Sequence, residues 1–129
     1  MKFILADRQQ SARSALRLLL EQYDGMEFVG GTDELAGLLN LVASSKPGLI
    51  LVEWEMLGCW PKGQITALKN VCQTSIIVLD CCLDRRNEAI AAGADYYVSK
   101  SDNPEHIMAV LSNFTNNLES NNNPGTQVS

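Results

Sequence analysis

Charged side chains stand directly after apolar segments of this sequence. They are Asp7 and Arg8 after residues 2–6, Glu53 after residues 49–52, Asp80 after residues 75–79, and Lys100 shortly after residues 96–98. In an open parallel sheet the ligand crevice lies outside the carboxyl ends of the strands. If the apolar segments are such strands, these side chains converge. Three carboxylates and two cations could then hold a metal ion or neutralise one another.

The elements that must position these side chains are strands alternating with helices. Residues 49–52 are apolar on both faces of the pleat, which is typical of a central parallel strand covered by helices. Strands are predicted over residues 2–6, 26–30, 49–52, 75–79 and 96–98. Helices are predicted from a cap at Ser11 to Gly25, from Thr32 or Asp33 to Lys46, over 64–71, over 85–92 with Asp84 as cap, and from Asp102 or Asn103, with Pro104 in the first turn, through Phe114.

This alternation predicts an α/β fold, a flavodoxin-like doubly wound five-stranded parallel sheet in the order 2-1-3-4-5 with helices on both faces. The 129 residues are 46% hydrophobic and 19% charged, as expected of one globular domain. We expect that domain over residues 1–118, and a flexible tail or linker over the Asn-rich residues 119–129.

Composition also excludes several classes of function. The net charge of -5 argues against direct binding of a nucleic-acid backbone. No apolar run approaches the length of a membrane span, and Asp7 and Arg8 interrupt the amino-terminal apolar segment too early for a signal peptide, so we expect a cytoplasmic protein. The four cysteines form no CxxC pair and His106 is the single histidine, so no zinc site is expected and the cysteines should be reduced.

Longer motifs give the chain a resemblance to a known family. These motifs are ILAD at residues 4–7, PGLILVEWEM at 47–56, IIVL at 76–79 and AAGADYYVSK at 91–100. With them, residues 2–116 resemble a response-regulator receiver (CheY-like) domain, the phosphoacceptor module of two-component phosphorelay signal transduction. EFVG at residues 27–30 and KSDNPE at 100–105 resemble the NarL-type branch, whose receivers usually precede a helix-turn-helix DNA-binding domain.

The resemblance assigns family roles to residues of this sequence, and several do not match. It places the phosphoacceptor aspartate at Glu53, the two adjacent acids that help to hold Mg²⁺ at Asp7 and Arg8, and the hydroxyl residue after the fourth strand at Asp80. The positions that agree with the family are Asp7, Lys100 and the aromatic switch position, Tyr97. The chain therefore looks like a receiver that is degenerate at its phosphoacceptor site.

Physical chemistry indicates that these departures abolish phosphorylation. Mg²⁺ prefers oxygen ligands, whereas Arg8 brings a guanidinium that cannot deprotonate. Glu53 displaces the carboxylate by about 1.5 Å, the length of a C–C bond, and Asp80 adds negative charge beside an incoming phosphoryl group. We therefore expect no cofactor, and Mg²⁺ binding is not expected. The vestigial ligand positions are Asp7, Glu53 and Glu55.

In place of a metal we predict ion pairs. Arg8 should reach Glu53, and Lys100 should meet Asp80 or Glu53; the alternative is that Arg8 points to solvent. Glu53 could also mimic a charged, activated state. Against that, Asp80 lacks the hydroxyl that normally couples this site to Tyr97, so Tyr97 is either fixed in one rotamer or is a half-buried strand aromatic.

The predicted function is that of a pseudo-receiver, a signalling and protein-interaction module and not an enzyme. Its partners, or a second copy of itself, would bind the face of the fourth helix, fifth strand and fifth helix, or that of the first and fifth helices. One alternative is the regulatory half of a NarL-type transcriptional regulator whose effector domain lies beyond Ser129. Others are a receiver phosphorylated on Glu53, and a metal enzyme that uses Asp7, Glu53, Glu55 and Asp80.

Overall fold

The strands form one parallel sheet, described in a computed structural model that covers residues 1–81, 85–100 and 107–113. They are β1 (Lys2–Ala6), β2 (Glu27–Thr32), β3 (Leu49–Glu53), β4 (Ser75–Asp80) and β5 (Tyr96–Ser99). Their order is β2-β1-β3-β4-β5, with every neighbouring pair parallel, so the predicted fold class and strand order are confirmed.

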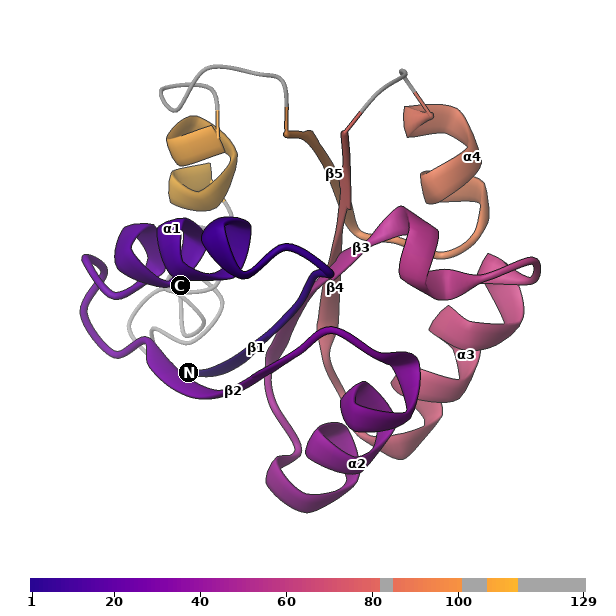
Figure 1. The fold of residues 1–129 in the computed structure, drawn as a ribbon, viewed down its shortest axis with the longest axis horizontal. Helices are drawn as coiled ribbons and strands as arrows, with labels where there is room; N and C mark the ends of the chain where they lie inside the picture. Colours follow the sequence, from indigo (N-terminus) through magenta and orange to yellow (C-terminus); the bar gives the residue numbers. More distant parts are fainter. Residues whose placement is uncertain (82–84, 101–106, 114–129) are drawn as a thin grey trace, which may run out of the picture.

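Helices cover both faces of this sheet (Figure 1). They are α1 (Gln10–Leu20), α2 (Leu35–Ser45), α3 (Pro61–Val71), α4 (Arg86–Ala91), the short 3-10 helix η1 (Trp54–Leu57), and a helical segment over residues 107–113. One core cluster packs α1 and residues 107–113 on the sheet through Leu16, Leu20 and Leu111. The other packs α2, α3 and α4 through Leu38, Leu68 and Ala89.

Alternation along the strands explains the two clusters. In β1, Phe3 and Leu5 belong to the cluster under α1, whereas Ile4 and Ala6 belong to the opposite cluster. Successive side chains of a strand point to opposite faces, so a strand covered on both sides must be apolar throughout. All five residues of β3 are buried, including Glu53 at its carboxyl end. The apolar run therefore places an acid where the core meets the edge of the sheet.

Several predicted helix boundaries were wrong. Ser11 is not an N-cap, because α1 begins at Gln10 and Gln9 occupies the cap position without a side-chain cap bond. The Asp7 carboxylate instead accepts a hydrogen bond of 2.8 Å from the Gln9 backbone N–H, which turns the chain before the helix. Helix α1 also ends at Leu20, five residues before Gly25, which adopts a positive φ of 84° in the turn to β2.

Neither predicted residue caps α2 either. Thr32 ends β2, and its hydroxyl accepts a hydrogen bond of 3.2 Å from the Glu34 N–H, while Glu34 itself occupies the cap position. Helix α3 begins at Pro61 and is longer than predicted, because proline is well suited to the first helical turn. The predicted caps Asp84, Asp102 and Asn103, together with Pro104, Phe114 and the tail over 119–129, lie outside the described residues.

Two further observations concern membrane-spanning helices and the state of the cysteines. Among the described residues, no helix is long and apolar enough to cross a membrane. Cys59 and Cys72 are free thiols, in agreement with the expectation of reduced cysteines at these two positions.

Candidate functional site

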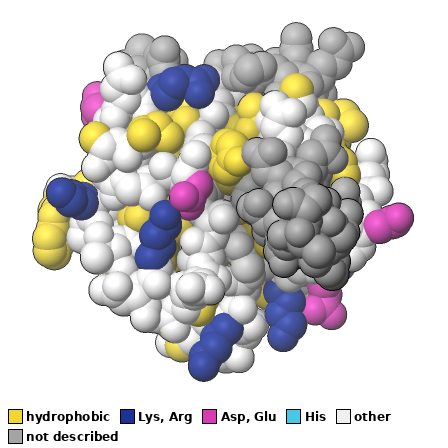
Figure 2. Space-filling model, turned by 180° about the vertical axis from the view of Figure 1, so that it is seen from behind, with side chains coloured by type: hydrophobic (Ala, Val, Ile, Leu, Met, Phe, Trp, Pro, Cys, Tyr) yellow, Lys and Arg dark blue, Asp and Glu magenta, His cyan; other side chains and the backbone are white. Residues whose placement is uncertain are grey.

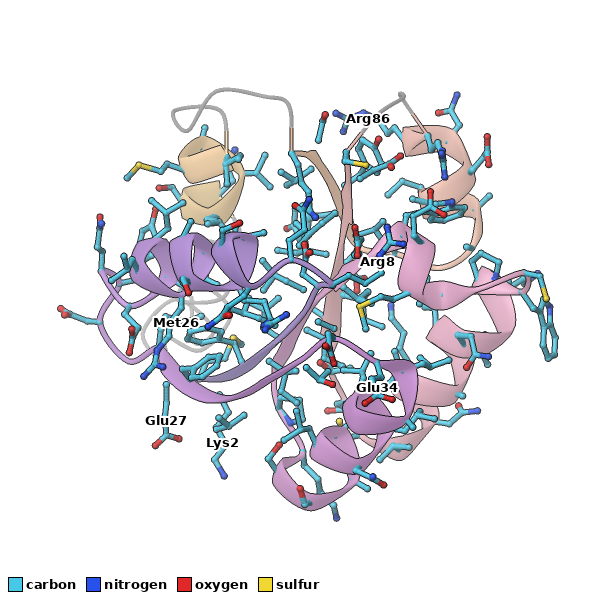
Figure 3. The ribbon with its side chains drawn as sticks, viewed as in Figure 1. Lys2, Arg8, Met26, Glu27, Glu34 and Arg86 are labelled. Atoms are coloured by element: carbon cyan, nitrogen blue, oxygen red, sulfur yellow. The ribbon has the colours of Figure 1, made fainter. Side chains whose placement is uncertain are left out.

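The charged residues after the strands gather at the carboxyl-terminal edge of the sheet, where Figure 3 labels Arg8. The register makes this possible, because Ala6 lies opposite Val52, Glu53 opposite Leu79, and Asp80 opposite Ser99. The strands thus end nearly level with one another. Asp7, Glu53 and Asp80 are almost completely buried, with exposures of 0%, 3% and 1%. Buried carboxylates require charged or hydrogen-bonding partners, so their contacts define the site.

Arg8 and Glu53 form the predicted contact, in a bidentate arrangement. Arg8 Nε lies 2.9 Å from Glu53 Oε1, and Arg8 Nη2 lies 3.2 Å from Oε2. The Arg8 backbone N–H also donates to Oε1 at 3.1 Å. The Arg8 side chain is 55% exposed, but its guanidinium is bound to Glu53 and does not point freely into solvent. Both oxygens of the buried Glu53 carboxylate are therefore occupied by arginine donors.

Lys100 joins a second carboxylate to this pair. Its Nζ lies 3.3 Å from Glu53 Oε2 and 2.5 Å from Asp7 Oδ2. The contact with Asp7 is an ion pair without hydrogen-bond geometry, so that oxygen has no hydrogen-bond donor among the described residues. Of the two predicted partners of Lys100, the side chain meets Glu53 and not Asp80, while Asp7 was not predicted. We call Asp7, Arg8, Glu53 and Lys100 the ion cluster.

Asp80 belongs to a different set of contacts. The Tyr97 hydroxyl donates to Asp80 Oδ2 at 3.0 Å and accepts a hydrogen bond of 3.1 Å from the Arg85 backbone N–H. Arg85 Nε lies 3.5 Å from the same Asp80 oxygen. Tyr97 is only 3% exposed, so it is buried and not half-buried. We call Asp80, Tyr97 and Arg85 the tyrosine cluster.

The tyrosine cluster corrects two sequence-based expectations. Asp80 was expected to be uncoupled from Tyr97 because it lacks a hydroxyl group, but its carboxylate accepts a hydrogen bond directly from the tyrosine hydroxyl. Arg85, which was expected only as the first residue of the helix over 85–92, binds Asp80 and, through Nη1 at 3.1 Å, Glu55. Glu55 therefore pairs with Arg85, and its charge also raises the pKa of Arg8 in the ion cluster. The available signal for Arg85 was a basic residue shortly after β4, which ends in Asp80. The direction of its side chain, however, depends on the connection to α4.

The surrounding charges determine the protonation state of Glu53. Burial alone raises the pKa of this carboxyl, but the hydrogen bonds from the Arg8 side chain and backbone and the charge of Lys100 outweigh burial and lower the pKa to about 2. Glu53 in turn raises the pKa of Arg8. Glu53 is thus ionised throughout the physiological pH range.

Comparison with known proteins identifies the family of this chain. Residues 3–112 match the response regulator receiver domain. The chain belongs to the response regulator receiver family. An "uncharacterized transcriptional regulatory protein" of Bacillus subtilis, YhcZ, is 31% identical to this receiver over 115 residues, which are 84% of this chain and 52% of the relative. The chain thus spans about half the length of the curated relative it matches.

Solved structures show the same receiver fold. The response regulatory domain of mrkE from Klebsiella pneumoniae superimposes with a TM-score of 0.80 at 20% identity, over 93% of this chain and 99% of that one. The isolated receiver domain of RcsB from Salmonella enterica serovar Typhimurium, studied with a phosphomimetic, gives 0.76 at 21% identity over 90% and 88%. The receiver of NarL from Mycobacterium tuberculosis gives 0.73 at 17% over 87% and 93%.

The first prediction concerns the cause of the low Glu53 pKa. Replacing Arg8 with alanine removes the guanidinium donors to both oxygens but keeps the backbone donor and Lys100, so the pKa of Glu53 should rise above 2 towards its ordinary value of 4.5. Carboxyl ¹³C NMR over a pH titration measures this shift. Lys62→Ala, at an exposed lysine of α3, is the control and should leave the pKa unchanged. An unchanged pKa in Arg8→Ala would show that the pairing is unimportant.

The second prediction concerns stability as a function of pH. The folded-state pKa of Glu53 lies below the ordinary 4.5, so its contribution is fully present above about pH 4.5 and is lost as the pH falls towards 2. Glu53→Gln should lower the free energy of unfolding by about 1–3 kcal/mol at pH 7. Between pH 4.5 and 2 the native protein should lose stability more steeply than the variant, by at most about 1.4 kcal/mol per pH unit. Urea denaturation at several pH values tests this, and parallel curves would contradict it.

The third prediction concerns the tyrosine cluster. A double-mutant cycle of Tyr97→Phe and Asp80→Ala should give a coupling energy of about 0.5–3 kcal/mol, because each change removes the same buried hydrogen bond. As a control, Tyr97→Phe and Glu53→Gln should be additive within about 0.5 kcal/mol, since Glu53 is held by other residues. Additivity in the first cycle would mean that the Asp80–Tyr97 bond contributes nothing.

Proposed function

We propose that this chain is a pseudo-receiver, which signals through protein contacts and is not phosphorylated at position 53. The observation that carries the proposal is the bidentate bond between Arg8 and Glu53. A phosphoacceptor needs a free carboxylate oxygen that can attack phosphorus in line. Here both oxygens of Glu53 accept hydrogen bonds from Arg8, and Lys100 approaches one of them.

A magnesium ion does not fit these residues. Mg²⁺ requires a near-octahedral shell of oxygen ligands at roughly 2.0–2.1 Å. The Lys100 ammonium lies between Asp7 and Glu53, and Arg8 replaces one of the acids of the family pattern with a second cation. Within the described part of the chain, no three His, Cys, Asp or Glu side chains form a set that could hold a metal. Mg²⁺ would have to displace two cations already paired with the same carboxylates.

The same pairing bears on whether Glu53 imitates an activated state. Glu53 is negatively charged, but Arg8 and Lys100 compensate that charge within the site. On our proposal the carboxylate therefore presents no uncompensated charge to the switch residues. Tyr97 is held inward by Asp80, so its position depends on a permanent side chain and not on a transferred phosphoryl group. The receiver would then rest in one state that its partners recognise.

Protein partners or a second copy would bind the receiver-type faces. One face comprises α4, β5 and residues 107–113, and the other comprises α1 and residues 107–113. Lys and Arg side chains are scattered over the face shown in Figure 2, with no single basic patch, and the net charge is -5. Both observations support protein recognition over direct nucleic-acid binding by this domain. A cytoplasmic location and the absence of catalysis stay predictions.

A second candidate is the regulatory part of a DNA-binding transcriptional regulator of NarL type. It is favoured by the 31% identity to a protein described as a transcriptional regulator, of which this chain spans 52%. The structure of RcsB bound to promoter DNA superimposes on this chain with a TM-score of 0.77. The matched part is 60% of the RcsB chain. A helix-turn-helix domain encoded in frame after residue 129 would establish this candidate. The two candidates are compatible, because a pseudo-receiver could regulate such a domain.

The fourth prediction tests phosphorylation directly. Incubation with acetyl phosphate or beryllofluoride in the presence of Mg²⁺ should give no adduct by intact mass spectrometry and no chemical-shift changes at Glu53. Displacing a reacting group by about 1 Å already costs roughly 10²-fold in rate, and here the metal site is also blocked. A stoichiometric adduct on Glu53 would overturn the proposal.

The matched control is a chain with the family residues restored. Arg8→Asp, Glu53→Asp and Asp80→Thr together should recover Mg²⁺-dependent labelling if the lost chemistry resides in these positions. Circular dichroism must show that the triple variant is folded. Labelling of the triple variant but not of the native chain would support the proposal most strongly.

A further inference from the structure

A cavity of about 340 Å³ lies between α1 and the helical segment 107–113. Its floor is formed by Leu79 of β4 and Val98 of β5, and its walls include Leu16 of α1 and Ile107 of the facing segment. Figure 1 shows these two helical elements on the same side of the sheet. The volume is within the range of small-molecule sites, roughly 300–1,000 Å³.

The packing of the two helical elements explains why this space is left open. The turn after α1 is joined to the facing segment, because the Tyr23 hydroxyl lies 2.9 Å from Ser112 Oγ, and Leu111 is buried in the core cluster that α1 shares. Elsewhere α1 lines the cavity with the small side chains of Ala12 and Ala15, and the facing segment lines it with Ile107. The contacts of Tyr23 and Leu111 thus hold the two segments together, and small residues of α1 leave room for the cavity.

The lining has a clear chemical polarity. Among the described residues the floor and most of the walls are aliphatic, whereas Gln9, Ser11 and Lys100 lie at the end nearest the ion cluster. The Lys100 ammonium is already paired with Asp7 and Glu53, so it offers little attraction to an anion. A carboxylate ligand would also approach those two acids. The amide of Gln9 and the hydroxyl of Ser11 suit a neutral polar group.

We propose that this cavity binds a small neutral amphipathic molecule, with an aliphatic or aromatic body on Leu79 and Val98 and a hydroxyl or carbonyl group at the Gln9–Ser11 end. An aliphatic lining without an occupant forfeits dispersion contacts, and apolar cavities bind apolar molecules for this reason. This site is distinct from the phosphoacceptor position. The inference does not depend on whether Glu53 can be phosphorylated.

Such a ligand would contact the residues that support both clusters. Leu79 directly precedes Asp80, and Val98 lies two residues before Lys100. The Lys100 backbone N–H donates to the Asp80 carbonyl at 2.6 Å, so the two strand ends move together. Occupancy of the cavity would therefore be sensed at the same edge of the sheet that a phosphoryl group modifies in other receivers.

The test uses 1-octanol and octanoate as probes of matched length and different charge. In ¹³C-methyl NMR, octanol should cause saturable shifts of Leu16, Leu79, Val98 and Ile107, and raise the melting temperature. Octanoate should bind at least about tenfold more weakly, a difference of about 1.4 kcal/mol. Ala12→Leu fills the cavity from α1 and should weaken octanol binding by at least about tenfold.

Control variants separate the site from non-specific binding. Ala67→Leu adds the same side chain at an exposed position of α3 and should leave octanol affinity within about twofold. If Ala12→Leu does not fold, Ala15→Leu at the mouth of the cavity takes its place, and NOEs from octanol to the Ile107 methyl groups locate the probe in the native chain.

Three results would overturn the proposal. The first is the absence of saturable shifts, and the second is octanol binding that neither alanine variant weakens. The third is octanoate binding more tightly than octanol, which would contradict the neutral class of ligand. Each of these outcomes is independent of labelling by acetyl phosphate, so failure here and failure of the proposed function can be told apart.

Discussion

The compensation of buried carboxylates by fixed cations is the constraint on which this site depends. Asp7 and Glu53 end two neighbouring strands and are almost wholly removed from solvent. Two acids so placed cannot both remain ionised in an apolar surrounding without positive charge beside them. In receivers with the full family pattern a divalent cation supplies that charge. Here Arg8 and Lys100 supply it from within the chain.

A covalently attached cation differs from a bound ion in one decisive respect. A metal ion leaves and returns, and its occupancy changes with a bound phosphoryl group, whereas Arg8 is present at all times and remains charged. Its side chain is also half-exposed, so forming the pair does not require complete desolvation of both charges. On our proposal the site is therefore stable without a ligand and holds no vacancy that phosphorylation chemistry could use.

The sequence predicted the sheet and the Arg8–Glu53 contact because both follow from strand order. Asp7 and Glu53 stand at the ends of adjacent strands. The contact of Arg8 with Glu53 could therefore be predicted without detailed knowledge of the loops. The helix starts were less predictable: Ser11 and Thr32 are typical capping residues, but the Asp7 and Thr32 side chains form turns just before each helix that fix its first residue. The contacts of Arg85 were missed because the direction of its side chain depends on the connection between β4 and α4. The path of that connection cannot be read from its amino-acid composition.

The separation of the ion cluster from the tyrosine cluster bears on how this receiver would signal without phosphorylation, as we propose. A phosphoryl group at position 53 would have to contact residues of both clusters to move the switch aromatic. In this chain Glu53 is bound by Arg8 and Lys100, whereas Asp80 is bound by Tyr97 and Arg85. Each half has its own charge compensation, and among the described residues a backbone bond from the Lys100 N–H to the Asp80 carbonyl joins the two halves. On our proposal, signals that reach the Tyr97 face travel through the backbone and packing of β4 and β5, and those two strands also form the floor of the cavity under α1.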